Sequence, residues 1–109
     1  MKLEHEFLKL VHNNIVIGII EQGCTCDPKT SFTGRPFWEV TVGRALIMGS
    51  AKDVLFPGDG EANFSLAVDD RVVLKSLYLT RMKSSFQLEK SNTIVVEGMV
   101  FLTNAAPEL

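Results

Sequence analysis

A run of eleven residues near the end of the chain, TIVVEGMVFLT at 93–103, limits the folds open to this protein. Read with a period of two, one set of alternate positions holds only apolar residues or glycine: Ile94, Val96, Gly98, Val100 and Leu102. β-Branched residues dominate the run and no proline interrupts it, which is typical of a strand. Because a strand with one apolar face must lie against a core, we expect this face to point inward.

Other segments repeat the strand pattern at intervals of roughly ten residues, separated by turn residues. They are 2–11, 15–21, 37–48, 62–68, 71–80 and 86–88. Segments 2–11 and 71–82 also fit a helix, but the pairing of neighbouring segments favours strands. No internal repeat is evident. The chain therefore predicts a single all-β domain over 1–109, an antiparallel barrel or sandwich of about six to eight strands with room for one short helix.

Two of these segments predict where the sheet curves and where it is central. In 37–48 one face is apolar except for Arg44, and Gly43 in mid-strand predicts a bend or bulge. That face carries Trp38, Val40, Val42, Leu46 and Met48. In 15–21 neither face is polar, because isoleucines alternate with Val16, Gly18 and Ile20, so this strand is predicted to be central or to lie at an interface. The tail after residue 103 is predicted to fray.

Composition places the chain among ordinary globular proteins, with 46% hydrophobic and 22% charged residues in 109. The net charge of −2 disfavours a protein that works by broad attraction to phosphates. Charged residues interrupt the first ten positions, which argues against a secretion signal, and the longest apolar run is far too short to span a membrane. We therefore expect a cytoplasmic protein without a membrane partner, in which both cysteines are reduced.

A long loop is predicted at 22–36, because glycines, prolines and hydroxyl residues gather there. A loop of this length in a small domain is often functional. Aromatic and basic residues follow in and after it, and a second group of basic residues with interleaved aromatics lies within 71–90. The candidate ligand-binding residues are Phe32, Arg35, Phe37, Trp38, Tyr78, Arg81 and Lys83.

Cysteine and histidine residues raise a metal hypothesis that their spacing does not favour. Cys24 and Cys26 are separated by a single residue, and His5 and His12 both lie upstream, unlike a familiar zinc knuckle. We therefore predict two reduced thiols and no metal or cofactor. A zinc enzyme or a Cys/His-dependent enzyme remains an alternative, although no third group is spaced to orient the histidine.

The function predicted from these features is binding rather than catalysis, with no family resemblance to guide it. Strands with two apolar faces carry more apolar surface than one small core covers, which predicts a homo-oligomer, most simply a homodimer. The ligand is predicted to be a protein or a small molecule, bound through the 22–38 region and an apolar strand face. The alternative is a single-stranded nucleic acid held in a basic and aromatic groove, as in barrels of the oligonucleotide-binding type.

Overall fold

The computed structural model describes residues 8–51, 64–89 and 92–108, and its strands form a closed antiparallel barrel. The elements in chain order are β1 (Leu8–His12), β2 (Ile15–Thr30), β3 (Pro36–Met48), the 3₁₀ turn η1 (Gly49–Ala51), β4 (Phe64–Val68), β5 (Arg71–Glu89) and β6 (Thr93–Thr103). This confirms the all-β class and the barrel, with helix limited to one short turn in the described ranges. Residues 2–7 of the first expected strand and residues 62–63 of the strand expected at 62–68 lie outside the described residues.

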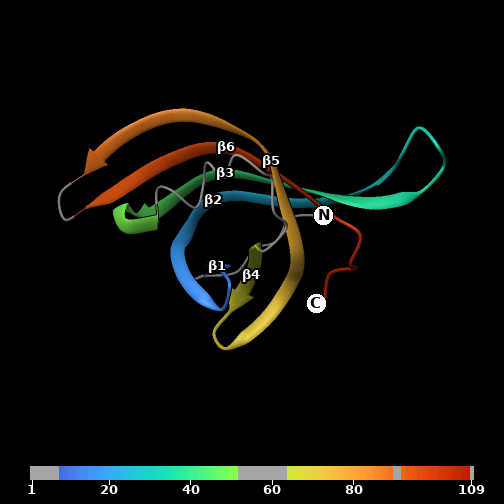
Figure 1. The fold of residues 1–109 in the computed structure, drawn as a ribbon, viewed down its shortest axis with the longest axis horizontal. Coiled ribbons are helices and arrows are strands. Elements are labelled where there is room, and N and C mark those ends of the chain that lie inside the picture. Colours follow the sequence, from blue (N-terminus) through green and yellow to red (C-terminus); the bar gives the residue numbers. More distant parts are fainter. Residues whose placement is uncertain (1–7, 52–63, 90–91, 109) are drawn as a thin grey trace.

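Around the barrel the strands follow the order β1-β2-β3-β6-β5-β4, and β4 pairs with β1 to close the ring. Figure 1 shows the long strands β2, β3, β6 and β5 sweeping over one side while the short strands β1 and β4 complete the other. The segment 93–103 forms β6, with the bounds expected from its sequence, and β5 is a strand rather than a helix. The first part of β2 is central as expected, because β1 and β3 flank it.

The ring is built from two β-meanders, β1-β2-β3 and β4-β5-β6, which pair through β3–β6 and β1–β4. The β1–β2 and β4–β5 hairpins share the register of three pairs and the bulge between them, with residue numbers that differ by 56. These are Leu10↔Gly18, Val11↔Val16 and His12↔Ile15 in the first meander, and Leu66↔Leu74, Ala67↔Val72 and Val68↔Arg71 in the second. The two hairpins therefore share a register although no repeat is evident in the sequence.

The predicted loop at 22–36 is wrong, because most of it is strand. β2 runs without a break to Thr30 and pairs with β3 as far as Thr30↔Pro36, which leaves only 31–35 as the connection. Pro28 is typical of a loop, yet it sits opposite Trp38 where β1 no longer pairs with β2. A proline is tolerated there because its missing N–H removes no ladder hydrogen bond on an unpaired side.

Two other boundaries also differ from expectation. Segments 71–80 and 86–88 belong to one strand, β5, which continues through the polar stretch between them and pairs with β6 along most of that length. The tail after Thr103 does not fray. Its Glu108 N–H donates to the Val73 carbonyl at 2.8 Å, and Arg71 Nη2 donates to the Glu108 carbonyl at 3.2 Å.

Three glycines lie side by side where the long strands bend. The neighbouring pairs place Gly23 opposite Gly43 in the β2–β3 pairing and Gly43 opposite Gly98 in the β3–β6 pairing. A Cβ built on Gly23 would lie 3.6 Å from the Gly43 Cα, and both Gly23 and Gly98 have positive φ. Glycine permits this backbone without strain and lets a sheet curl into a barrel, so the bend predicted at Gly43 extends across three strands.

At this bend the strands exchange their inner and outer faces, so two predicted faces are only half right. In β6 the core residues are Ile94 and Val96 before Gly98 but Met99 and Phe101 after it, while Val100 and Leu102 fall outside the core cluster. In β3 the core residues change from Val40 and Val42 to Ala45 and Ile47. Arg44 consequently leaves the core side and pairs with Glu21, with Nε 2.6 Å from Oε2.

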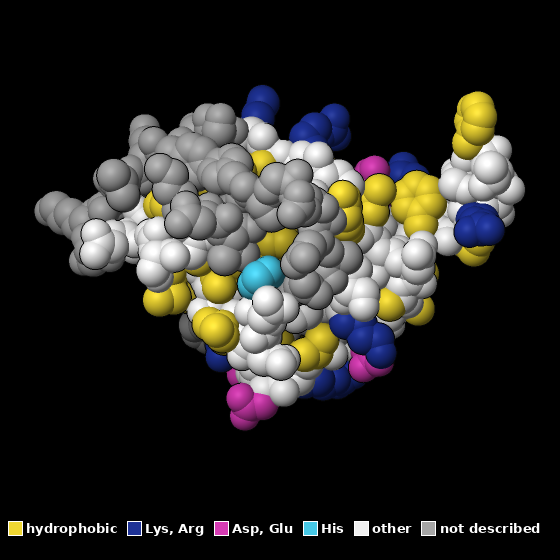
Figure 2. Space-filling view, viewed as in Figure 1, with side chains coloured by type: hydrophobic (Ala, Val, Ile, Leu, Met, Phe, Trp, Pro, Cys, Tyr) yellow, Lys and Arg dark blue, Asp and Glu magenta, His cyan; other side chains and the backbone are white. Residues whose placement is uncertain are grey.

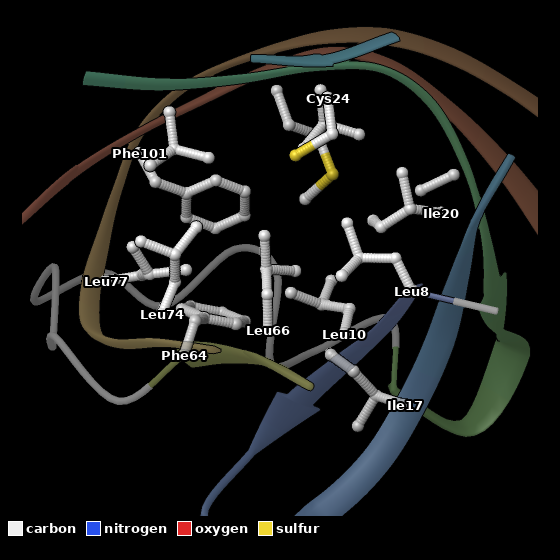
Figure 3. Packing of buried hydrophobic residues seen from close by; sticks show 14 of the residues in the cluster. Leu8, Leu10, Ile17, Ile20, Cys24, Phe64, Leu66, Leu74, Leu77 and Phe101 are labelled. Atoms are coloured by element: carbon white, nitrogen blue, oxygen red, sulfur yellow. The ribbon is translucent and has the colours of Figure 1, made fainter. Parts of the chain in front are cut away.

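The core fills the barrel with aliphatic side chains and two phenylalanines. The Phe64 and Phe101 rings pack at a centroid distance of 5.6 Å, a usual spacing for tilted aromatic pairs. Figure 3 shows both rings near Leu74 and Leu77, with Cys24 pointing into the same interior. Ile17 and Ile20 enter the core from β2, whereas Ile15, Val16 and Ile19 stay exposed. The bulge at Ile17 accounts for this departure from strict alternation.

We predict that Gly98→Ala lowers the free energy of unfolding by about 1–3 kcal/mol, because a non-glycine residue in left-handed backbone is strained. The new Cβ would also lie 3.3 Å from the Lys83 Cβ. Gly34→Ala is the control for backbone strain alone, since Gly34 has a φ of +84° but nothing lies within 4 Å of the place a Cβ would take, so the loss at Gly98 is expected to be the larger. Urea unfolding of both variants checks the prediction, and a Gly98→Ala loss no larger than that of Gly34→Ala would contradict it.

Candidate ligand-binding groove

An open groove of about 1010 Å³ lies between the β2–β3 turn, β5 and the end of β6. It draws its walls from three separate parts of the sequence. The lining residues are Ser31, Thr33, Arg35, Pro36, Phe37, Ser76, Tyr78, Leu102, Thr103, Asn104 and Ala105. Its volume is at the upper end of the range typical of small-molecule sites. The β2–β3 hairpin that bounds it projects from the barrel in Figure 1, and Figure 2 shows both hydrophobic and basic side chains at its tip.

The turn at 31–35 is ordered by its own hydrogen bonds. Ser31 N–H donates to the Arg35 carbonyl at 2.8 Å, and Gly34 N–H donates to the Ser31 carbonyl at 2.9 Å. The Ser31 hydroxyl accepts from the Arg35 N–H at 3.0 Å and lies 3.1 Å from the Thr33 hydroxyl. Gly34, at a φ of +84°, supplies the left-handed residue that a turn this tight requires. The groove therefore has one wall that is formed before any ligand arrives.

Arg35 and Phe37 continue from this turn along the start of β3. Pro36 disfavours helical backbone at the residue before it, so Arg35 is held extended and in line with the strand. Phe37 follows two residues later on the outer face, because its neighbour Trp38 packs against the core. Consequently the guanidinium and the phenyl ring are presented on the same side of the hairpin.

Leu102 and Asn104 form the floor, and β5 forms the far wall. Tyr78 stands opposite Leu102 in the β5–β6 register, and its outward direction follows from Leu77, which is in the core. Ser76 has a φ of +58° and lies where β5 carries an extra residue relative to β4. A bulge of this kind re-aims a side chain, and here Ser76 lines the groove.

Thr103 joins the floor to the far wall. It is the only polar residue that is fully buried among the described residues, with 4% of its surface exposed. Its hydroxyl donates to the Lys75 carbonyl at 2.9 Å and accepts from the Ala105 N–H at 3.1 Å. Because both hydrogen-bonding functions are satisfied, burial of this hydroxyl carries little penalty and fixes the bulge against the tail.

The groove carries one charge, and that charge is positive. Arg35 is the only charged residue among the described lining residues, and it forms no ion pair with any other described side chain. Two cations on β5 are matched by acids: Lys75 Nζ lies 3.7 Å from Glu108 Oε1, and Lys83 stands opposite Glu97 in the register. Lys29 of β2 stands opposite Phe37 and adds a second positive charge beside the groove. The electrostatic potential of the groove is therefore positive.

Of the seven residues predicted to bind ligand, Arg35, Phe37 and Tyr78 meet in this groove. Phe32 is fully exposed at the tip of the hairpin turn. Trp38 is half-buried against the core and is not among the lining residues. Arg81 and Lys83 lie farther along β5, opposite Val100 and Glu97, and do not line the groove.

Sequence reasoning missed the hydroxyl and amide residues of the lining. Ser76, Thr103 and Asn104 belong to segments with no motif, and they reach the groove through the β5 bulge and the docked tail. Only the alternation of Leu77 and Leu79 around Tyr78 carried a signal that this part of β5 has an outward face.

The two cysteines point into the core rather than toward a surface site. Cys24 and Cys26 are buried without forming a disulfide, and they share the barrel interior with Val40 and Val42. Burial raises the pKa of the Cys24 thiol to about 12, with a smaller contribution from Cys26, and burial likewise raises the pKa of Cys26. His12 packs on Phe64 at 4.9 Å, and His5 lies outside the described residues. Among the residues described, no three His, Cys, Asp or Glu side chains gather as metal ligands.

Comparison with known proteins adds no family. No family model, no curated protein and no solved structure matches this chain. None of the helical segments in the described residues is long and apolar enough to cross a bilayer. The groove therefore has to be interpreted from its own residues.

We predict that iodoacetamide alkylates the native thiols slowly even at pH 9. The thiolate is the reactive form, and a pKa of about 12 leaves roughly one Cys24 in a thousand ionised at that pH. Mass spectrometry of the native and the urea-unfolded protein gives the comparison, with fast labelling expected only after unfolding. Rapid stoichiometric labelling of the native protein would contradict the buried placement and revive the Cys/His alternative.

Proposed function

We propose that this protein is a non-enzymatic binding module that holds a protein segment or a small ligand in the groove. The observation that carries the proposal is the convergence of Arg35, Phe37 and Tyr78 from distant parts of the sequence onto one concave surface. Concave sites with apolar walls and a few polar groups are the usual form of ligand sites. Two hydrogen-bonded supports, the 31–35 turn and Thr103, hold the walls in position and reduce the entropy lost on binding.

Charge favours this proposal over single-stranded nucleic acid. A strand of phosphates needs a continuous run of cations, but Asp27 and Glu39 pair in register on the hairpin next to the groove. Lys75 and Lys83 are each matched by an acid, Glu108 and Glu97 respectively. The aromatic rings of the groove suit base stacking, so titration with an oligothymidine tests the nucleic-acid alternative.

We predict that ligands from a library of small organic compounds and tripeptides perturb the amide resonances of Thr33, Tyr78 and Asn104. Nuclear magnetic resonance titration with ¹⁵N-labelled protein measures both the site and the affinity. Tyr78→Ala is expected to weaken the ligands found at least fivefold, because it removes one aromatic wall. Lys83→Ala, a change on the same strand outside the groove, should leave affinity unchanged.

Two outcomes of that titration would count against the proposal. Ligands that perturb only residues outside the groove would remove it. An oligothymidine that quenches Trp38 fluorescence at low salt and loses this effect at high salt would favour the nucleic-acid alternative instead.

The proposal also includes self-association through exposed apolar side chains on the outside of the barrel. Ile15, Val16 and Ile19 of β2 and Met48 of β3 are each about half exposed or more, and we call this group the outer apolar patch. Ile19 pairs with Leu46, two residues from Met48, so the members lie on adjoining strands. Figure 2 shows hydrophobic side chains gathered around the first turn, at the lower left of the view. Association with a second copy would remove this surface from water.

We predict that light scattering reports a dimer whose dissociation constant rises at least tenfold on Ile19→Lys. The substitution puts a charge in the centre of the outer apolar patch, where burial would leave it without a partner. Val72→Lys is the matched control, because Val72 is exposed to a similar degree on β5. A wild-type protein that is monomeric at 100 μM or more would contradict self-association and would leave the groove proposal intact.

A further inference from the structure

We propose that the groove takes a compact aromatic anion, whose ring lies over Leu102 between Phe37 and Tyr78 and whose carboxylate or phosphate pairs with Arg35. This inference rests on the proposed function and adds the chemical class of the ligand. Three features of the groove support it: the width of the slot between the two aromatic residues, the place of the charge, and the limit on ligand length.

The slot is set by strand spacing. Phe37 lies on β3 and Tyr78 on β5, with β6 between them, as the β3–β6 and β5–β6 pairings require. The β3 residue level with Leu102 and Tyr78 is Glu39, and Phe37 lies two residues farther along β3. Two strand spacings of about 4.8 Å and two residues of rise therefore separate the backbones of Phe37 and Tyr78 by a diagonal of roughly 12 Å. A flat ring over the Leu102 side chain fits this gap and meets an aromatic side chain on each side, within the usual 4.5–7 Å between ring centroids.

The anionic group is placed by Arg35. This residue precedes Phe37 by two positions in extended chain, which puts their Cα atoms roughly 7 Å apart. Its guanidinium is the only charge in the described lining, and the hydroxyls of Ser31 and Thr33 stand beside it in the turn. A carboxylate or a phosphate oxygen group matches the forked donors of a guanidinium, whereas an ammonium ion would be repelled.

The length of the ligand is limited on the side toward the barrel. Glu39 of β3 stands opposite Leu102 in the β3–β6 register and opposite Asp27 in the β2–β3 register. The Glu39 carboxylate repels a negative group that reaches it, so the anionic end of the ligand is favoured at Arg35 rather than beyond Leu102. The charge pattern therefore selects a ligand with one anionic end and an uncharged ring.

The test uses small probes that differ in one property each. The reference probe is 3-phenylpropanoate, whose short linker separates a phenyl ring from a carboxylate. 3-Phenylpropanamide removes the charge, 3-cyclohexylpropanoate removes the planar ring, and phenyl phosphate replaces the carboxylate by phosphate. Amide resonances of Thr33, Tyr78 and Asn104 in the full chain report binding, and the dissociation constant is measured for each probe.

We expect 3-phenylpropanoate to bind at least fivefold more tightly than its amide and at least threefold more tightly than the cyclohexyl analogue. Exposure of Arg35 keeps the first ratio modest, because solvent screens an exposed ion pair. Arg35→Gln should make acid and amide equal, and Lys83→Gln is the charge-matched control that should not. Arg35→Gln is expected to weaken the binding of phenyl phosphate by the same factor as that of 3-phenylpropanoate. Whichever of these two probes binds the wild-type protein more tightly identifies the preferred anionic group.

The outcomes separate this inference from the function on which it rests. Equal binding of acid and amide in the groove would overturn the aromatic-anion class while leaving a ligand-binding groove. Stronger binding of the cyclohexyl analogue would overturn the role of the two rings. Failure of every probe, together with failure of the tripeptides and small organic compounds to perturb the groove, would overturn both proposals.

Discussion

The pairing of β3 with β6 joins the two meanders of the barrel, and a pair of glycines stands at its centre. The pairs run from Trp38↔Thr103 to Met48↔Thr93 in one unbroken register, with Gly43 and Gly98 bracketed in the middle. Without side chains at this level, the strands bend sharply enough to enclose a core in so small a barrel. The same bend turns Arg44 outward, where Glu21 neutralises it, and brings Met99 inward.

The groove is a consequence of how far the strands continue past the closed ring. β1 and β4 are five residues long, whereas β2 has 16 and β5 has 19. The β2–β3 hairpin therefore projects beyond the ring and presents its turn opposite β5 and the end of β6. A short, hydrogen-bonded turn on a long hairpin gives a rigid wall, which a flexible loop over 22–36 would not have given.

Alternation along the chain was enough to predict the fold class and the bounds of β6, since period-two patterns depend only on local burial. The alternation pattern failed where one residue of irregular backbone exchanged the inward and outward sides of a strand. This happens at Gly98, at Ser76 and at the Ile17 bulge. Residue type predicted Arg35, Phe37 and Tyr78 as candidates, but their meeting depends on strand order, which no local pattern encodes. The register that the two hairpins share has no counterpart in the sequence, because residues 8–20 and 64–76 are identical only at Leu10/Leu66 and Val16/Val72.

The chain leaves β3 and β6 along different paths, and the path after β6 determines the groove beside the β2–β3 hairpin. After β3, Gly49 turns at once toward the β5–β6 hairpin, and its N–H donates to the Asn92 carbonyl, so strand end and hairpin are in contact there. After β6, the tail runs instead along β5, where Glu108 bonds to Val73 and Thr103 bonds to Lys75. The β2–β3 turn is thereby left apart from the strand end that it faces, and the space between them is the groove. The groove at this end of the described barrel therefore follows from the path of the tail, which docks on β5 instead of covering the β2–β3 turn.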